Sequence, residues 1–463
     1  MQTLFVAQYL KMKKYIIITF VIFFVSLSFA QESFEWKLFN EFVTLFNNKD
    51  FDSAYKLIHP DLIDFVKNND PTLYSFFGES GSIENVIFTR FDSNTVEITL
   101  TAIAGKDSLF RNFFIIKEED HYYFTKPWYA LTKNWDTVES EHFIFIFDGK
   151  NKHPEYGING PSSLSIDIFE ERIRWFLNIL DIKKLEKKIQ VYMASSPEEV
   201  ARLVGAEGKF EGITLPGADF CIAVFPYAIL HEVGHILLYK KSGKSMLPSI
   251  LKHGIEEYGD GNGGLWKNHL STYWTQQKID TGDSLSLKDI KNFPETTSFT
   301  KFLIEEWGNV KFRQLLKCIS NQKDSDLISL IETVYQTKIE KIEEDWMNWI
   351  TNYHETTEPL IRNRIEFRII VDNFSRNNLG ENTTVYCDSE RKLPSDDQVR
   401  NFEKSYFNQK SSFIKKSHQT IELYLLNNKN RMKELFGTED SVYIFKNIIA
   451  ITTEIDSINW DNK

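Results

Sequence analysis

Apolar residues recur along the first part of the chain with two different periods. Over Leu38–Phe46 they follow the three- and four-residue spacing of a helix buried on one side. Over Val96–Ala102 they alternate with polar residues, which is the period of a half-buried strand. Phe110–Ile116 and His121–Phe124 are expected to pair as a hairpin. Helices followed by an antiparallel sheet indicate a small α+β domain over residues 31–132.

Residues 135–352 mix apolar strands with amphipathic helices. The predicted strands are His142–Phe147, Lys188–Met193 and Phe220–Phe225. Helices are expected from Ser165 and after Ser196, where Ser-Pro-Glu-Glu forms a capping box with Pro at the first helical position. The later helices are Phe299–Trp307, Phe312–Ile319 and Ile339–Ile350. A mixed sheet followed by a helical part is the expected architecture of this second domain.

The last segment, residues 360–463, is predicted to be a third α+β domain. Its expected elements, in chain order, are a strand at Ile365–Val371, a helix capped at Ser395, a helix over Ser412–Leu426 and a closing strand within Val442–Ile451. It contains no motif that indicates a chemical role. The whole chain is therefore expected to be a multidomain α+β protein.

The N-terminus has the pattern of a secretory signal peptide. Three lysines precede Ile16–Leu27, an apolar run that is short for a membrane span, and Ser28-Phe29-Ala30 supplies small residues before a cleavage site. Residues 1–30 are predicted to be a signal peptide, so the mature protein is expected to be exported, periplasmic or secreted, with no stable membrane span. The alternative is an uncleaved N-terminal anchor.

Charge and cysteine content narrow the function classes. The formal charge is −11, and removing residues 1–30, which carry three Lys and no acids, makes it −14. With no basic run, nucleic acid is not an expected partner. Cys221, Cys318 and Cys387 form no C-x-x-C pair, so they indicate neither a zinc knuckle nor a redox motif. One disulfide with a free thiol, or three buried thiols, both fit the count.

The chemistry of the chain is concentrated in His231-Glu232-Val233-Gly234-His235, an H-E-x-x-H pattern within an apolar helix. Histidines four residues apart lie on one helix face and can both bind one Zn2+ at about 2.0–2.1 Å. Zinc lowers the pKa of a bound water toward about 7, and Glu232 can accept the proton as the water attacks a carbonyl. The alternative is a helix whose histidines are only hydrogen-bonded.

A catalytic zinc site needs a third protein ligand, and a second short helix offers three candidates. These are His253, Glu256 and Glu257, which all lie within one helical turn. Imidazole and carboxylate are both acceptable zinc donors, so the residue types alone leave the choice open.

The sequence resembles the gluzincin metallopeptidases, in particular the bacterial peptidase MA-like group. That pattern is H-E-x-x-H followed by P-x-W-L-x-E-G-x-A-x-Y, and residues 248–258 fit it with Pro248, Leu251, Gly254 and Tyr258 in place. Further matches are Ser140-Glu141-His142-Phe143, Ser298-Phe299 with Phe302-Leu303-Ile304 and Trp307-Gly308, and Glu340–Ile350. The helix-then-sheet order of residues 31–132 resembles, at the level of fold only, the cone-shaped NTF2-like domains.

The resemblance implies an exported zinc metallopeptidase that acts on a peptide or protein, and it indicates no particular oligomeric state. The family's ligand Glu is replaced by His253, which favours a metal set of His231, His235 and His253 with Glu257 in an outer position; Glu257 or Glu256 as ligand is the alternative. Where many relatives carry an oxyanion-donating Tyr, Phe293 stands, so Tyr258, Tyr273 or His269 is the expected substitute. The replaced ligand also favours a second hypothesis, an inactive scaffold of the cell envelope.

Overall fold

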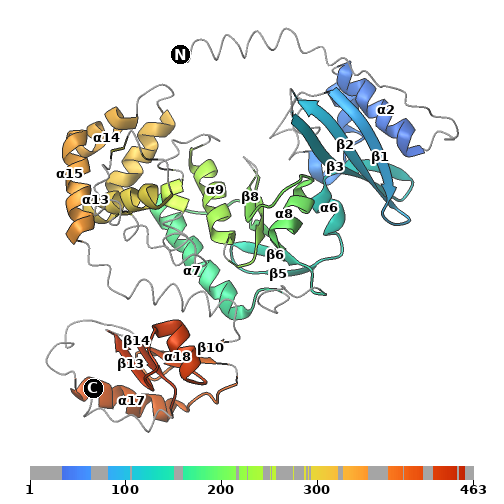
Figure 1. Cartoon of the computed structure of the whole chain (residues 1–463). Helices are drawn as coiled ribbons and strands as arrows, with labels where there is room; N and C mark the ends of the chain where they lie inside the picture. Colours follow the sequence, from blue (N-terminus) through green and yellow to red (C-terminus); the bar gives the residue numbers. More distant parts are fainter. Residues whose placement is uncertain are drawn as a thin grey trace. The chain divides into compact units, whose positions relative to one another are not determined.

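The structure is a computed structural model. The described residues are 34–48, 50–63, 82–104, 107–150, 160–214, 218–226, 228–242, 251, 253–256, 275, 286–287, 290, 293–321, 327–352, 374–388, 390–409, 421–445 and 448–453. Within them the chain forms three sheets with helices, which confirms the α+β class (Figure 1). The predicted signal peptide lies outside the described residues.

The first sheet is antiparallel and packs against a helix. Its strands, in spatial order, are β1 (Ser82–Arg90), β2 (Thr95–Ala104), β3 (Asp107–Glu118) and β4 (His121–Thr125). Helix α2 (Phe34–Asn47) lays Phe42 on Phe124 of β4, with ring centroids 4.7 Å apart, and is followed by α3 (Phe51–Tyr55). The predicted helix, alternating strand and hairpin are confirmed, whereas β1 was not predicted.

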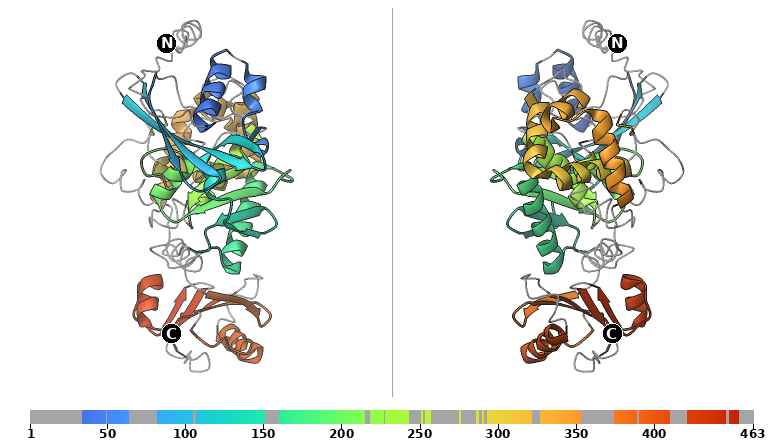
Figure 2. Two further views of the ribbon diagram at one scale, coloured as in Figure 1. Left: turned by 90° about the vertical axis from the view of Figure 1, so that its right-hand side faces the viewer. Right: turned by 90° about the vertical axis from the view of Figure 1, so that its left-hand side faces the viewer.

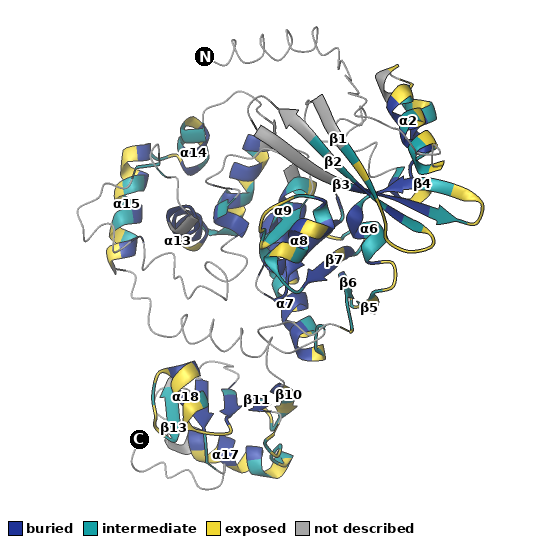
Figure 3. Cartoon of the chain, turned by 45° about the vertical axis from the view of Figure 1, so that its right-hand side comes forward, coloured by how far each residue is buried: buried dark blue, intermediate teal, exposed yellow. Residues whose placement is uncertain are grey.

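The second sheet has the strand order β5-β6-β7-β9-β8. The strands are β5 (Asp136–Glu139), β6 (Phe143–Phe147), β7 (Ile189–Ala194), β8 (Gly212–Thr214) and β9 (Phe220–Val224). Strand β7 runs parallel to β9, and the short β8 runs antiparallel to β9. Figure 3 shows β7 in the dark blue of buried residues, as expected for a strand paired on both sides. The three predicted strands of this segment are confirmed within one or two residues.

Two helices lie between these strands in the sequence. Helix α7 (Ser163–Leu180) begins two residues before the predicted Ser165, because the Ser162 side chain caps it, and its apolar stripe is buried. Helix α8 (Pro197–Val204) is capped by the Ser196 side chain, which accepts from Glu199 N. The Glu199 carboxylate, however, accepts from the backbone and hydroxyl of Ser195 rather than from Ser196 N, so the capping box is shifted by one residue. A short helix, α6 (Pro127–Leu131), precedes β5.

The later helices lie together, as both views of Figure 2 show. They are α13 (Phe293–Asn321), α14 (Leu327–Tyr335) and α15 (Ile339–Asn352). The two helices predicted on either side of Gly308 are continuous in α13 except at that glycine, whose φ of 79° interrupts the helix. The indole of Trp346 on α15 donates to the Ser298 hydroxyl of α13 at 3.0 Å, deep in the core.

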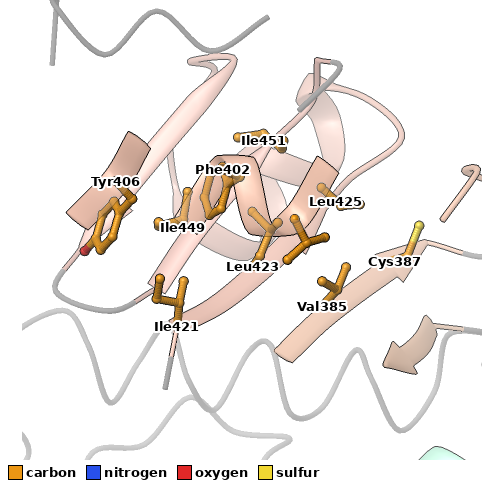
Figure 4. Packing of buried hydrophobic residues seen from close by; sticks show 10 residues of the cluster. Val385, Cys387, Phe402, Tyr406, Ile421, Leu423, Leu425, Ile449 and Ile451 are labelled. Atoms are coloured by element: carbon orange, nitrogen blue, oxygen red, sulfur yellow. The ribbon is translucent and has the colours of Figure 1, made fainter. Parts of the chain in front are cut away.

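The third sheet, with the order β10-β11-β12-β14-β13, has its own core. Its strands are β10 (Phe374–Leu379), β11 (Thr383–Asp388), β12 (Ile421–Leu425), β13 (Val442–Phe445) and β14 (Ile448–Ile451), with helices α17 (Asp396–Gln409) and α18 (Lys429–Phe436). Phe402 and Tyr406 of α17 pack against the sheet residues Leu423 and Ile449 (Figure 4). The helix predicted over Ser412–Leu426 is wrong where the chain is described, because residues 421–425 form the parallel strand β12.

The chain divides into two compact units: residues 1–137, 146–151 and 190–224 form one, and residues 138–145, 152–189 and 225–463 form the other. Each of the three sheets falls within one of the three predicted segments, and the three-domain division itself stays a prediction. Cys221, Cys318 and Cys387 are all free thiols; Cys221 and Cys387 are buried, whereas Cys318 is half-buried, so the alternative of three buried thiols holds only in part. None of the described helices combines the length and the apolar character that crossing a membrane requires.

A buried carboxylate ties the start of β6 to α7. Glu170, which is 5% exposed, accepts from Ser140 Oγ at 2.6 Å and from His142 N at 2.8 Å through Oε1, and Oε2 lies 2.6 Å from His142 Nδ1. Burial raises the pKa of the Glu170 carboxyl, but the hydrogen bonds from Ser140 and His142 outweigh that effect and hold the pKa below its usual value.

Replacing Glu170 with Gln is expected to lower the free energy of unfolding by about 2–3 kcal/mol at neutral pH, because charge-assisted hydrogen bonds are lost. Since the folded-state pKa is depressed, this contribution is present above the unfolded pKa of about 4.5 and disappears as the pH falls through the folded value. Urea denaturation of the wild type and Glu170→Gln across acid and neutral pH measures it. Glu171→Gln, on the exposed side of α7, is the control, and an equal loss in both variants would contradict the prediction.

Candidate metal centre

The H-E-x-x-H residues lie on α9 (Ile229–Ser242), which begins three residues after Pro226. The helix is held in place by apolar residues that are at most 2% exposed: Ile229, Leu230, Val233, Ile236 and Leu237. The rings of His231 and His235 have centroids 4.9 Å apart, and both side chains are about one-fifth exposed. Glu232 is buried at 6% exposure. The predicted arrangement, two imidazoles one turn apart with a carboxylate between them, is present in the fold.

A second helical segment, residues 253–256, meets α9 at this point. Leu251 and Ile255 anchor it, and both are 0% exposed. Its approach to α9 is close because a Cβ on Gly234 would lie 3.0 Å from Glu256 Cγ and 3.2 Å from Glu256 Cα. Glycine at position 234, one of the two variable positions of the motif, therefore lets the two backbones come together.

The same segment is equally close to α13 on its other side. A Cβ on Gly254 would lie 2.5 Å from the carbonyl oxygen of Thr296 and would collide with the Thr300 side chain. Both threonines are buried in the first turns of α13. Residues 253–256 are thus wedged between two helices, with a glycine at each contact.

The wedge places a fully buried carboxylate among three imidazoles. Glu256 is 0% exposed; its Oε1 lies 2.5 Å from His235 Nδ1, and its Oε2 lies 3.3 Å from His253 Nδ1 and 4.0 Å from His231 Nε2. These nitrogens are close but are not aligned as hydrogen-bond donors: within the described residues, neither carboxylate oxygen accepts a hydrogen bond of normal geometry. Burial raises the pKa of Glu256, whereas the imidazoles of His235 and His253 lower it, and the net direction is downward.

The donors fit a divalent metal ion. His231, Glu232 and His235 form one group whose ligand atoms lie within 4.8 Å of one another, and His231, His253 and Glu256 form another. A buried carboxylate without hydrogen bonds is costly unless a cation compensates it. Imidazole nitrogens with a carboxylate oxygen are a donor set that Zn2+ accepts, and imidazole also suits iron, nickel and copper.

The structure brings together five of the predicted site residues: His231, Glu232, His235, His253 and Glu256. Four others, Glu257, Tyr258, His269 and Tyr273, lie outside the described residues. The outer position that the sequence assigned by preference to Glu257 is therefore untested, while Glu256, given there as an alternative ligand, contacts all three imidazoles.

Sequence reasoning missed the two glycines that create the wedge. The motif contains Gly234 only as a variable position, and the resemblance contains Gly254 only as a framing residue, so neither pattern predicts a role in packing. A signal was present, since glycine inside an otherwise apolar helix usually marks a close approach of another backbone.

Glu141, His142 and Glu170 form another group with metal-ligand spacing. Here both Glu170 oxygens already contact donors of Ser140 and His142, and Glu141 pairs with Arg174 at 3.3 Å. The group is explained by its internal hydrogen bonds, and it accounts for the Ser-Glu-His-Phe pattern of the sequence as a tie between β6 and α7.

Comparison of the chain with known protein-family models and with curated proteins gives no match. The resemblance to gluzincin peptidases therefore rests on the motif residues of the sequence alone.

Alanine at either wedge glycine is expected to destabilise the protein, although Gly→Ala inside a helix otherwise stabilises by about 1 kcal/mol. Gly254→Ala should cost more than Gly234→Ala, because it collides with a backbone carbonyl that cannot rotate away, and overpacking of this kind costs about 1–3 kcal/mol. Chemical denaturation of the two variants measures the order. A stabilised Gly254→Ala protein would show that the wedge is looser than described.

Proposed function

We propose that this protein is an exported zinc-dependent metallopeptidase with a gluzincin-type catalytic domain. The observation that carries the proposal is a pair of donor groups that share His231: one is His231, Glu232 and His235, and the other is His231, His253 and the buried carboxylate Glu256. A helix with merely hydrogen-bonded histidines, the alternative for the motif, does not require a buried carboxylate that accepts no aligned hydrogen bond.

Each residue of the centre has a role in this proposal. The three imidazoles would hold Zn2+, which when bound supplies Lewis-acid polarisation of a water and of the substrate carbonyl. Glu232 would accept the proton of the attacking water and deliver it to the leaving amine. Its burial at 6% exposure strengthens its electrostatic interaction with the reacting groups.

The proposal also assigns roles to the segments on either side of the catalytic domain. Residues 1–30 would direct export, residues 31–132 would form an NTF2-like domain, and residues 360–463 would form a C-terminal domain without catalytic residues. The partner would be a peptide or protein substrate. Several residues expected to complete the substrate side, Tyr258, His269 and Tyr273, belong to the proposal on the strength of the sequence only.

One observation favours a second candidate, a metal-binding scaffold of the cell envelope without turnover. Three imidazoles and a carboxylate are four potential protein donors, and structural zinc sites are closed by four donors whereas catalytic sites keep one position open. This candidate predicts stoichiometric metal and no hydrolysis.

The test uses residues 31–463. Metal analysis of the purified protein is expected to give one zinc per chain, and a mixture of peptides of varied sequence, followed by mass spectrometry, should show cleavage. Glu232→Gln is expected to keep the metal and to lower kcat by about 10²–10⁴-fold, because the general base is lost.

Metal analysis and the cleavage assay together distinguish the peptidase from the scaffold. His231→Ala with His235→Ala should remove both metal and activity. Metal in the wild type with no cleavage of any peptide would favour the scaffold, and a wild-type protein that binds no zinc when zinc is supplied would end both proposals.

A further inference from the structure

We propose that Glu256 is itself a metal ligand of this centre, so that the 253–256 segment supplies two donors, an imidazole and a carboxylate one turn apart. The inference rests on the metal centre of the proposed function and deepens it. With Glu256 and all three imidazoles bound, a peptidase would need a fifth coordination position for water, which catalytic zinc can adopt, whereas the scaffold would need none. It also departs from the family pattern, in which the carboxylate ligand stands at the position that His253 occupies here.

The first argument is the state of the carboxylate. Glu256 is completely buried, and within the described residues neither oxygen accepts an aligned hydrogen bond. Glu170 is a matched comparison in the same chain: it is buried to a similar degree and also lies beside a histidine, but it accepts hydrogen bonds from Ser140 and His142. A buried carboxylate is stable when hydrogen bonds or a cation satisfy it. Glu170 has aligned hydrogen bonds, whereas the imidazole nitrogens beside Glu256 are close but not aligned.

The second argument is distance. Two donors on a tetrahedral Zn2+ with bonds of about 2.0–2.1 Å lie about 3.3 Å apart. Oε2 of Glu256 is 3.3 Å from His253 Nδ1, the separation expected of two donors on one ion. Its distance of 4.0 Å from His231 Nε2 is longer than that separation, so binding a tetrahedral ion would draw these two donors together. Oε1 is only 2.5 Å from His235 Nδ1, too close for two donors of one ion, so Oε2 is the oxygen that faces the metal.

The third argument is charge. Three neutral imidazoles leave the full double charge of a divalent cation in a site that is largely buried, whereas two imidazoles and one carboxylate, the usual gluzincin set, leave a single positive charge. Histidine at position 253 removes that negative charge from its usual place. Glu256 restores it from the next turn of the same segment, three residues away on the same helix face.

The buried side chains of Leu251 and Ile255 anchor the segment that carries both donors. Metal binding and the packing of this segment are therefore coupled. The metal should therefore raise the stability of the whole protein, and this increment should depend on Glu256.

The experiment measures Zn2+ affinity, the visible spectrum of Co2+ in the site, and the melting temperature with and without metal. Glu256→Gln keeps the shape of the side chain and is expected to weaken Zn2+ affinity by more than about 100-fold, because loss of an outer partner alone typically costs about 10–100-fold. The Co2+ spectrum should change, and the metal-dependent rise in melting temperature should be largely lost. Glu256→Asp, which keeps the charge but draws the oxygens back, should also weaken binding while folding is retained.

Glu170→Gln is the matched control: it should lower the melting temperature equally with and without metal and leave affinity and spectrum unchanged. A Glu256→Gln protein that binds Zn2+ within about 100-fold of the wild type with the same Co2+ spectrum would overturn the inference and leave Glu256 as an orienting partner of His235. Loss of metal in Glu256→Gln together with an inactive wild type would support the inference and reject the peptidase. Failure of the wild type to bind any metal would reject both.

Discussion

The burial of one carboxylate, Glu256, is the constraint on which the rest of the centre depends. Moving an ionised carboxyl group out of water costs several kcal/mol, and only close, well-placed partners offset that cost. Here the partners are imidazoles from two helical segments, which must be held within a few ångströms of one point. Gly234 and Gly254 make that spacing attainable, because any larger residue would push the 253–256 segment away from α9 or from α13.

The surrounding fold supplies the rigidity that such a site requires. Helix α9 packs with its aliphatic residues buried. A hydrogen bond from Trp346 to Ser298 joins α15 to α13. The patterns at Ser298-Phe299 and around Trp346 are thereby explained as core packing: the Phe299 and Trp346 rings lie 5.2 Å apart and position the first turns of α13, against which Gly254 rests. They support the centre without taking part in its chemistry.

Elements determined by local pattern were predictable from sequence, and elements determined by distant pairing were not. The buried stripe of α7 and the cap of α17 at Ser395 follow from periodicity and from side-chain hydrogen bonds within a few residues. Strand β12 has the sequence Ile-Glu-Leu-Tyr-Leu, and the spacing of its apolar residues predicts the end of a helix. It is a strand because it pairs in parallel with β11 and β14, and neither partner can be inferred from its own residues.

The candidate site also has a part that is determined by local sequence and a part that is determined by a tertiary contact. His231, Glu232 and His235 are fixed relative to one another by a single helix, so their spacing in sequence is sufficient. Spacing alone does not choose between Glu256 and Glu257, because on an ideal helix the positions three and four residues after His253 are both about one turn away and only about 100° apart around the axis. What favours Glu256 is the tertiary contact with Gly234, where the helices touch at the Glu256 backbone and bury its side chain. The glycine at the variable position of the motif is therefore a sequence feature that bears on the identity of the carboxylate.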